Sequence, residues 1–298
     1  RALNLRFPVI AKPNYEGSSM GITVDSVVDT AQDLESRVVG LLSRYSAGVL
    51  VEEFIIGRDV VVPFVEKAAV KGGVLEPASY DFDPRYTGNR KYQLYDYELK
   101  TEGSDGVSVR VPADIGADVR AKVMEYSHIA FRTLGVVDAG RIDFRITDKG
   151  EVFFLEVNAL PSLEKGASIY ESAKLAGLSN QEDVLDLIVK SAADRYGINT
   201  RTSRRSRRRP LQIGLTFNLK AVPGSPLSEE DSDAEFDNPN TIAAIRQALE
   251  SFGHKVVELE ATPELPSALP AAGVDLVFNI AEGLQGRSRE SQVPAILE

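Results

Sequence analysis

The chain has 298 residues with 34 Lys and Arg against 44 Asp and Glu, which gives a formal net charge of −10. This length allows one large or two ordinary domains, and the 43% hydrophobic content is that of a globular protein with a real core. The absence of Cys excludes a disulfide framework, a thiolate zinc site and a cysteine nucleophile. Only two His are present, so a metal would have to sit on carboxylates, which suits Mg²⁺.

The same composition limits the partners. An acidic balance argues against nucleic acid as a main partner. No apolar run approaches the roughly 18 residues of a membrane-spanning helix, and no leader segment is visible. We therefore expect no nucleic-acid or membrane partner and a cytoplasmic location.

Strand and helix signals alternate through the first two thirds of the chain. In chain order we expect a strand at 8–12, a helix at 30–45, strands at 49–54 and 59–65, a helix at 113–134, strands at 136–147 and 151–157, and helices at 168–177 and 181–195. Asp29 or Thr30 would cap the first of these helices.

An arginine-rich segment then interrupts the pattern, with six Arg in residues 201–209. No aromatic residues lie between them for base stacking, which favours a solvated linker over a nucleic-acid patch. A second α/β pattern follows, with a strand at 211–217, an acidic loop at 229–237, a helix at 239–252 and strands at 255–260 and 274–280. We predict a first unit at 1–197, a linker at 198–210 and a second unit at 211–298.

The predicted hairpin around Lys149-Gly150 is the most informative feature for chemistry. If these two residues form the turn, one face is apolar, because Ile142, Phe144 and Ile146 then pair with Val157, Leu155 and Phe153.

The other face of this hairpin is charged. It sets Asp143 against Glu156 and Arg141 against Asn158. Facing carboxylates repel, and a divalent cation between them would remove the conflict. Asp143, Glu156 and Asn158 offer three oxygen ligands, as Mg²⁺ is held in phosphoryl-transfer sites, and Arg141 could stabilise developing negative charge. An ordinary solvent-facing hairpin is the alternative.

Two polar loops could complete such a site. The loop from Lys12 to Gly21 offers a Lys, hydroxyls and backbone N–H groups to a phosphate, although it is not a GxxxxGK[ST] loop. Residues 92–100 hold three Tyr and a Lys, which suggests exposed tyrosines on a mobile lid. Ordinary surface segments are the alternative for both loops.

Six motifs carry a family resemblance: FPVIAKP at 7–13, EGSSMG at 16–21, VEEFIIGRD at 51–59, YDYELK at 95–100, GRIDF at 140–144 and FLEVNALP at 154–161. Together they resemble the ATP-grasp ligases, most closely the D-alanine–D-alanine ligase family, over about residues 5–197. The resemblance implies an α+β ATP-grasp fold with an antiparallel sheet. The second unit is similar to the family's N-terminal domain, which implies a small, doubly wound parallel α/β domain of the pre-ATP-grasp type.

The resemblance also implies roles residue by residue. Arg141 would stabilise the transition state, Ser18 would act from the phosphate-covering loop, and Tyr95 would lie near the second substrate. Asp143, Glu156 and Asn158 would bind two Mg²⁺ ions, for which Mn²⁺ is an alternative. ATP contacts are implied for Lys12, Ser18, Ser19, Glu52, Phe54, Ile55, Asp59, Lys100 and Asn158.

The implied reaction is ATP- and Mg²⁺-dependent carboxylate–amine ligation through an acyl phosphate, in peptidoglycan and cell-wall synthesis. The substrates would be amino acids or small peptides, and a homodimer is allowed. Ser162, Ala167 and Thr101 depart from the family pattern on the acceptor side. A ligase for another amino acid or a small peptide, or a non-catalytic regulatory ATP-binding module, is therefore the alternative.

The order of the two units departs from the family, in which the N-terminal domain comes first. Glu282-Gly283 stands where the family has His-Gly, and Glu235 or Asp237 could replace an acidic first-substrate ligand. We expect a fragment of a tandem protein, which holds the end of one module and the start of the next. Because the family's central segment supplies a second ATP lysine that is not found here, the chain alone is expected to bind ATP poorly and to be inactive.

Overall fold

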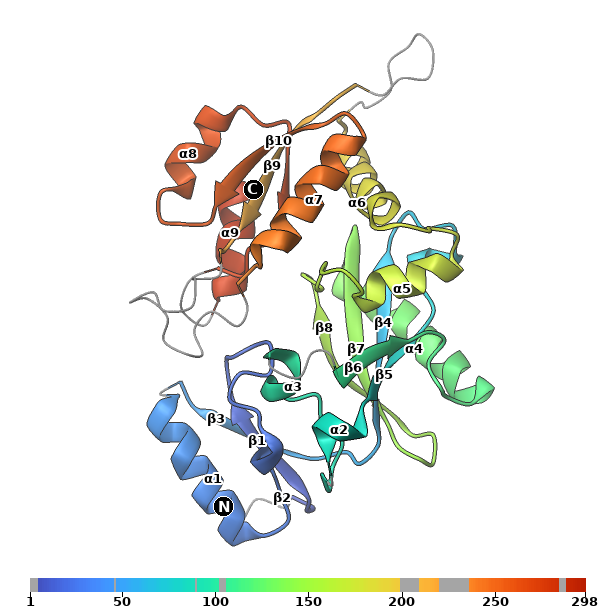
Figure 1. Ribbon diagram of the computed structural model, residues 1–298, viewed down its shortest axis with the longest axis vertical. Coiled ribbons are helices and arrows are strands. Elements are labelled where there is room, and N and C mark those ends of the chain that lie inside the picture. The colour runs from blue at the N-terminus through green and yellow to red at the C-terminus, as the bar shows by residue number, and fades with distance from the viewer. Residues whose placement is uncertain are drawn as a thin grey trace.

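The computed structural model describes residues 5–45, 47–88, 90–101, 106–198, 209–219, 236–283 and 288–298 (Figure 1). The arginine run at 201–208 and most of the acidic loop lie outside these residues. Residues 5–198 contain β1 (Val9–Pro13), η1 (Val24–Ser26), β2 (Val27–Val28), α1 (Ala31–Arg44), β3 (Val49–Glu53), β4 (Arg58–Val65), η2 (Lys71–Gly73), β5 (Ala78–Phe82), α2 (Pro84–Thr87), α3 (Tyr97–Thr101), β6 (Val107–Arg110), α4 (Ala117–Leu134), β7 (Ala139–Ile146), β8 (Val152–Asn158), α5 (Ser168–Leu175) and α6 (Gln181–Arg195). Residues 209–298 contain β9 (Gln212–Phe217), α7 (Pro239–Ser251), β10 (Lys255–Glu260), α8 (Leu265–Ala272), β11 (Leu276–Asn279) and α9 (Arg289–Leu297).

The first sheet is small and antiparallel, with β1 between β2 and β3. Helix α1 packs against it and begins as predicted, because the Thr30 side chain accepts a hydrogen bond from the backbone N–H of Asp33 at 3.2 Å. Thr30 rather than Asp29 is therefore the cap. The sheet presents the loop after β1 and the segment after β3 to the rest of the molecule.

The second sheet has five antiparallel strands in the order β6-β5-β4-β7-β8. Helix α4 covers one face, where Val60, Ile142 and Phe144 pack with Val123 and Phe131 in one buried cluster. This cluster fixes the strand that carries Arg141 and Asp143.

Helix α4 begins at Ala117 and not at residue 113 as predicted. The backbone N–H of Ala113 donates to the carbonyl of Pro77 at 2.8 Å, so that this residue is committed to the sheet side. Gly116 is the N-cap, and the left-handed Gly135 ends the helix.

The hairpin of β7 and β8 has the predicted register only near its open end. Asp143 pairs with Glu156, and Arg141 pairs with Asn158. Beyond a register shift the prediction was wrong, since Phe144 pairs with Phe154 instead of Leu155, and Ile146 pairs with Val152 instead of Phe153.

The turn explains this difference. Thr147 N donates to Glu151 O at 3.1 Å, which leaves a three-residue turn with Gly150 at a φ of 77°. A three-residue turn moves the pairing by one position, and the unpaired Leu155 in β8 moves it back before Glu156. The bulge also leaves Phe153, Phe154 and Leu155 at 38%, 49% and 51% exposure, so the predicted continuous apolar face is not formed.

The third sheet is parallel, in the order β10-β9-β11. One face packs against α7 in a cluster that includes Ile213, Leu215 and Ile245, and a second cluster joins Leu259 to α8 and α9. The first cluster also contains Leu185 and Val189 of α6, so the parallel sheet shares a core with the preceding unit (Figure 1). The boundary at 198–210 stays a prediction.

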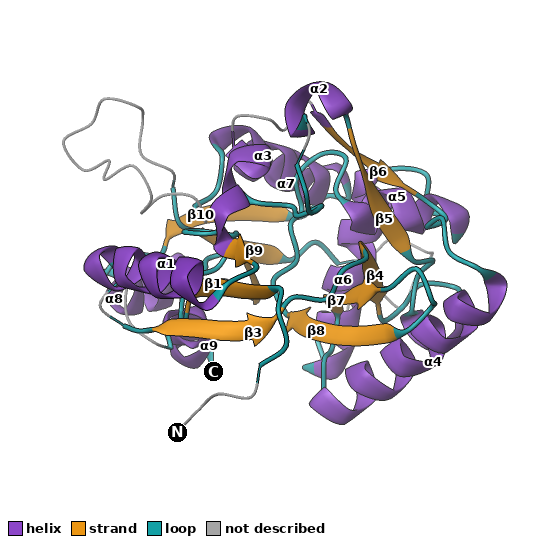
Figure 2. Ribbon diagram, turned by 90° about the horizontal axis from the view of Figure 1, so that it is seen from below, coloured by secondary structure: helices purple, strands orange, loops and turns teal. Residues whose placement is uncertain are grey.

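Figure 1 shows the three-stranded sheet of β1, β2 and β3 below the five-stranded sheet, although β3 and β8 fall in line in the view of Figure 2. Among the described helices, none combines the length and the apolar character that crossing a membrane requires.

Candidate active site

A large cleft of 2360 Å³ is lined by residues of all three sheets. It exceeds the roughly 300–1,000 Å³ of a pocket for one small ligand, so it has room for a nucleotide and a second substrate together. Every predicted site residue lines it: Lys12, Ser18, Ser19, Glu52, Phe54, Ile55, Asp59, Tyr95, Lys100, Arg141, Asp143, Glu156 and Asn158. The structure brings these residues together, while their individual roles stay predictions.

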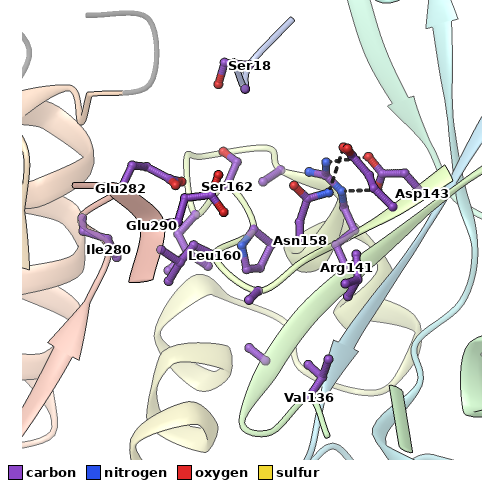
Figure 3. Close-up of a pocket in the computed structure, with 18 of the residues that line it drawn as sticks. Ser18, Val136, Arg141, Asp143, Asn158, Leu160, Ser162, Ile280, Glu282 and Glu290 are labelled. Atoms are coloured by element: carbon purple, nitrogen blue, oxygen red, sulfur yellow. Dashed lines mark hydrogen bonds and ion pairs between the residues drawn. The ribbon is translucent and has the colours of Figure 1, made fainter. Parts of the chain in front are cut away.

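The charged face of the β7–β8 hairpin lies at the centre of the cleft (Figure 3). Arg141 Nε donates to Asp143 Oδ1 at 2.6 Å, and Nη2 donates to Oδ2 at 2.8 Å. Burial lowers the pKa of Arg141, but the Asp143 carboxylate outweighs this effect and holds the pKa above its ordinary value. Arg141 is therefore a fixed positive charge with little freedom to turn.

The donor set beside Arg141 fits a hard divalent cation. Glu156 lies opposite Asp143, and Asn158 Nδ2 donates to Glu156 Oε1 at 3.4 Å, which leaves its amide oxygen for another partner. Each carboxylate oxygen of Asp143 accepts one hydrogen bond from Arg141, and each has further lone pairs. The described residues hold no group of three or more His, Cys, Asp or Glu suited to a metal, so the amide of Asn158 is needed to complete three oxygen ligands.

The loop after β1 has an uncommon backbone conformation. Ser18 and Ser19 have φ values of 47° and 62°, which non-glycine residues adopt rarely and mostly at functional sites. Met20 N donates to Gly17 O at 2.8 Å, so Ser18 and Ser19 form the corner of a tight turn. From α1, Arg37 Nη2 donates to Gly21 O at 2.8 Å and to Ser26 Oγ at 2.7 Å, which anchors the end of the loop.

The predicted lid is held in place, and its tyrosines are partly buried instead of exposed as predicted. Tyr95 packs against Tyr80 with 4.9 Å between ring centroids, and Ser19 Oγ donates to the Tyr95 carbonyl at 3.0 Å. Burial raises the pKa of Tyr95, and it raises the pKa of Tyr80 to about 12. Both phenols therefore stay protonated at neutral pH.

A buried ion pair fixes the start of α3. Asp96 is 0% exposed and lies 3.0 Å from Arg90 Nη1, while its Oδ1 accepts from Leu99 N at 3.2 Å. This arrangement places Lys100 in the cleft, with its ammonium 5.2 Å from the Tyr95 ring centroid. Lys100 is exposed as a whole residue, but crowding by protein atoms around its ammonium, and then the nearby Arg141 charge, lower its pKa.

The predicted nucleotide residues lie around the link from β3 to β4. Phe54 is buried there, and Lys12 Nζ lies 2.7 Å from Glu52 Oε2 across β1 and β3. Burial raises the pKa of Asp59, against the effect of the adjacent Arg145 charge. A phosphate would compete with Glu52 for Lys12.

The parallel unit forms the opposite wall. Of its three strands β11 lines the cleft, and the carboxyl ends of β9, β10 and β11 lie at one edge of the parallel sheet. Asn218 Oδ1 accepts from Gly283 N at 2.9 Å, and its Nδ2 donates to Ala261 O at 3.3 Å, which joins these ends. Glu282 and Glu290 reach towards Ser162 across the cleft (Figure 3).

Asp237 lies on the same wall. Burial raises its pKa to about 7, with a contribution from Glu164 and against the hydrogen bond from Asn218 N. Of the other acceptor-side positions, Ala167 is the N-cap of α5 and has no side-chain bond there. Glu235 and the side chain of Thr101 lie outside the described residues.

Sequence reasoning missed Arg145, Arg37 and Asn218. Each lies beside apolar residues, and each acts in part through backbone carbonyls or N–H groups that a motif does not display. A polar residue at a position predicted to be buried was the available signal.

Comparison with known proteins adds to this geometry. Residues 2–190 match the family model described as "D-ala D-ala ligase C-terminus". A D-alanine–D-alanine ligase A from Mesorhizobium japonicum is 34% identical over 64% of this chain and 51% of its own length. One from Geotalea uraniireducens is 31% identical over 64% of this chain and 56% of its own. The chain thus spans about half the length of the curated relatives it matches.

A crystal structure of a D-alanine–D-alanine ligase from Bacillus anthracis aligns with a TM-score of 0.49 and 22% identity, over 64% of this chain and 56% of that one.

Proposed function

Because the chain belongs to the D-ala D-ala ligase C-terminus family, we propose that its cleft joins a carboxylate to an amine at the expense of ATP. The observation that carries this proposal is the Arg141–Asp143 pair facing Glu156 and Asn158 in the cleft that also holds Lys12 and Lys100. Opposed carboxylates beside a fixed arginine suit the transfer of a highly charged phosphoryl group. A simple nucleotide-binding surface does not need that arginine.

The proposed reaction has two steps. The carboxylate of the first substrate attacks the γ-phosphorus of ATP, which releases ADP and forms an acyl phosphate. The amine of the second substrate then attacks the acyl carbon, loses a proton and expels inorganic phosphate, which leaves an amide.

The chain's own residues have distinct tasks in this scheme. Lys12, Lys100 and the N–H groups of the serine loop hold the phosphates, and Arg141 offsets charge on the transferring group and on the tetrahedral intermediate. Tyr95 and the packed segment around it exclude water that would hydrolyse the acyl phosphate. Mg²⁺, held by Asp143, Glu156 and Asn158, would shield the phosphate oxygens.

The acidic wall of the parallel unit fits an ammonium group. Glu282, Glu290 and Asp237 line that side of the cleft, and amino acids carry both the amine and the carboxylate that the reaction requires. With Ser162 and Ala167 on the acceptor side, an amino acid other than D-alanine, or a small peptide, is the proposed second substrate.

Phosphate release from ATP tests this function. The protein, expressed with any coding sequence that flanks it, is supplied with ATP, Mg²⁺ and a panel of D- and L-amino acids and dipeptides. We expect at least one amino acid or dipeptide to stimulate phosphate release. Tight ATP binding without stimulation by any of them would instead indicate a non-catalytic nucleotide-binding module.

The order of the units supports a tandem arrangement, in which the parallel unit is the N-terminal-type domain of a second module. Its resemblance to that domain type is clearest at 275–283. Sequencing the flanking coding region tests this arrangement. A second set of ATP-grasp motifs after residue 298 is expected, and a gene that encodes residues 1–298 alone would contradict it.

A further inference from the structure

Arg145 on β7 has no task in the proposed reaction, yet it is one of the most completely engaged side chains of the cleft. It follows Asp143 by two residues and is only 4% exposed. A buried guanidinium is unfavourable unless its N–H groups find acceptors, so the position of each acceptor is informative.

Two regions that are distant from Arg145 in the sequence, residues 55–59 and residue 93, supply these acceptors. Arg145 Nε donates to the carbonyl of Ile55 at 2.7 Å, and Nη1 donates to Asp59 Oδ1 at 2.7 Å. Nη2 donates to the carbonyl of Gln93 at 2.6 Å. The guanidinium carbon also lies 4.7 Å from the ring centroid of Phe54. One side chain thus joins the β3–β4 link, the start of β4 and the segment before α3.

The far end of that segment is tied to the serine loop. Ser19 Oγ donates to the Tyr95 carbonyl at 3.0 Å, and Tyr97 N donates to the Ile22 carbonyl at 3.1 Å. The segment from Gln93 to Tyr97 is therefore held by Arg145 at one end and by the loop after β1 at the other. Both ties end on backbone atoms, so they fix the path of the chain.

The chemistry of arginine is specific here. Its planar fork points several donors in fixed directions and stays charged at every working pH. A lysine ammonium can reach at most part of this set, because its donors diverge from one nitrogen at the end of a flexible stem.

We propose that Arg145 is a positioning residue that couples closure of the segment 93–97 to the nucleotide side of the cleft, through Ile55, Phe54 and Asp59. The nucleotide part of this coupling rests on the proposed function. The mechanical part is a property of the chain without any ligand.

Hydrogen exchange of the 298-residue chain without nucleotide tests the mechanical part. Arg145→Met and Arg145→Lys are compared with the wild type. Arg58→Gln is the matched control, because Arg58 is an exposed arginine on the neighbouring strand that bonds to Asp114. We expect backbone amides of 93–97 to exchange about tenfold faster in Arg145→Met, as expected from the loss of a charged hydrogen bond, with a smaller increase in Arg145→Lys.

Unchanged exchange at 93–97 in both variants would overturn the proposal, and so would an equal increase in Arg58→Gln. If circular dichroism shows that Arg145→Met does not fold, the exchange rates of Arg145→Lys test the proposal. This variant keeps the positive charge and loses the planar set of guanidinium donors.

Kinetics test the nucleotide part in the protein that turns over ATP. Arg145→Lys is expected to raise the KM for ATP about tenfold with a smaller change in kcat, and to abolish the protection that ATP gives residues 93–97. A fall in kcat with an unchanged KM for ATP would contradict the coupling. If the wild type shows no turnover, the proposed function fails, while the ligand-free exchange still decides the role of Arg145.

Discussion

At the residue scale, burial and charge set the protonation state of the cleft. Tyr80 and Tyr95 stay neutral because burial raises their pKa values, to about 12 for Tyr80, while Asp143 keeps Arg141 charged. Around the reacting centre the cleft therefore carries Arg141 as a fixed cation beside carboxylates, and two phenols that can donate hydrogen bonds. This combination suits a group that gains negative charge during a reaction.

Asp237 predicts a pH dependence of stability. Burial raises its pKa from 3.8 to about 7, so between these values the folded chain holds a proton that the unfolded chain has lost. The contribution of Asp237 to stability therefore falls as the pH rises through this window and is level above about pH 7. The pKa shift corresponds to a change in unfolding free energy of roughly 4 kcal/mol. Because the carboxyl is partly exposed, solvent screening reduces this change to about 1–2 kcal/mol.

Asp237→Asn removes this titration. The free energy of unfolding of the variant and of the wild type is measured with urea at pH 4 and pH 8. The difference between the two proteins should shift in favour of the variant by about 1–2 kcal/mol from pH 4 to pH 8. If the difference in unfolding free energy between variant and wild type is the same at both pH values, Asp237 is ionised in the folded chain.

At the element scale, the link between β3 and β4 depends on a close approach of backbones. A Cβ on Gly57 would lie 2.1 Å from the carbonyl oxygen of Ile146, which is at the end of β7 and cannot move without disturbing the sheet. Gly57→Ala is therefore expected to destabilise the chain by about 1–3 kcal/mol in thermal or urea unfolding.

Gly40 is the matched control for this substitution. It lies inside α1, and a Cβ there would meet nothing within 4 Å. Gly40→Ala should stabilise the chain by about 0.5–1 kcal/mol, because alanine favours the helix. A Gly57→Ala variant as stable as Gly40→Ala would show that the link can move away from β7.

The hairpin shows what the sequence can and cannot predict about such elements. The assumed two-residue turn at Lys149-Gly150 placed Asp143 opposite Glu156, and this pair is observed although the turn differs. The three-residue turn and the bulge at Leu155 compensate each other, so the open end of the hairpin is the same with or without them. A prediction from pairing alone therefore finds the site and misses the distortion.

At the scale of the whole molecule, α6 joins the parallel unit to the rest of the chain. Leu185 of α6 is fully buried in a core with Ile213 and Ile245, and Tyr196 Oη lies 3.0 Å from Glu298 Oε1. The acidic wall of the cleft depends on this contact. Sequence composition had separated the two units at the arginine run, and it gave no signal for a shared core, since an apolar helix face does not say which neighbour covers it.

Leu185→Ala tests this contact. A cavity in the shared core should cost about 2–5 kcal/mol of stability and speed amide exchange in β9 and α7. Leu175→Ala is the control, because Leu175 on α5 is 60% exposed, and it should stay within about 0.5 kcal/mol of the wild type. Exchange in β9 and α7 that is unaffected by Leu185→Ala would mean that the parallel unit is stable by itself.

For the polar residues of the cleft, too, the sequence does not show which neighbours the fold brings together. Lys12, Arg141, Asp143 and Glu156 could be named in advance because their charges stand in short, ordered motifs. Arg145 could not, because its acceptors are backbone carbonyls of Ile55 and Gln93 that only the fold brings together.

The most direct test of the central claim is metal-dependent phosphate release by Glu156→Gln, measured with the amino acid or dipeptide that stimulates the wild type. Glu151→Gln on the same hairpin is the control, since Glu151 is exposed and bonds to Thr147. If Glu156 faces Asp143 as a metal ligand, Glu156→Gln should lower Mg²⁺-dependent release by about 100-fold or more, and Glu151→Gln should leave it unchanged. Undiminished release by Glu156→Gln would remove the β7–β8 hairpin from the active site.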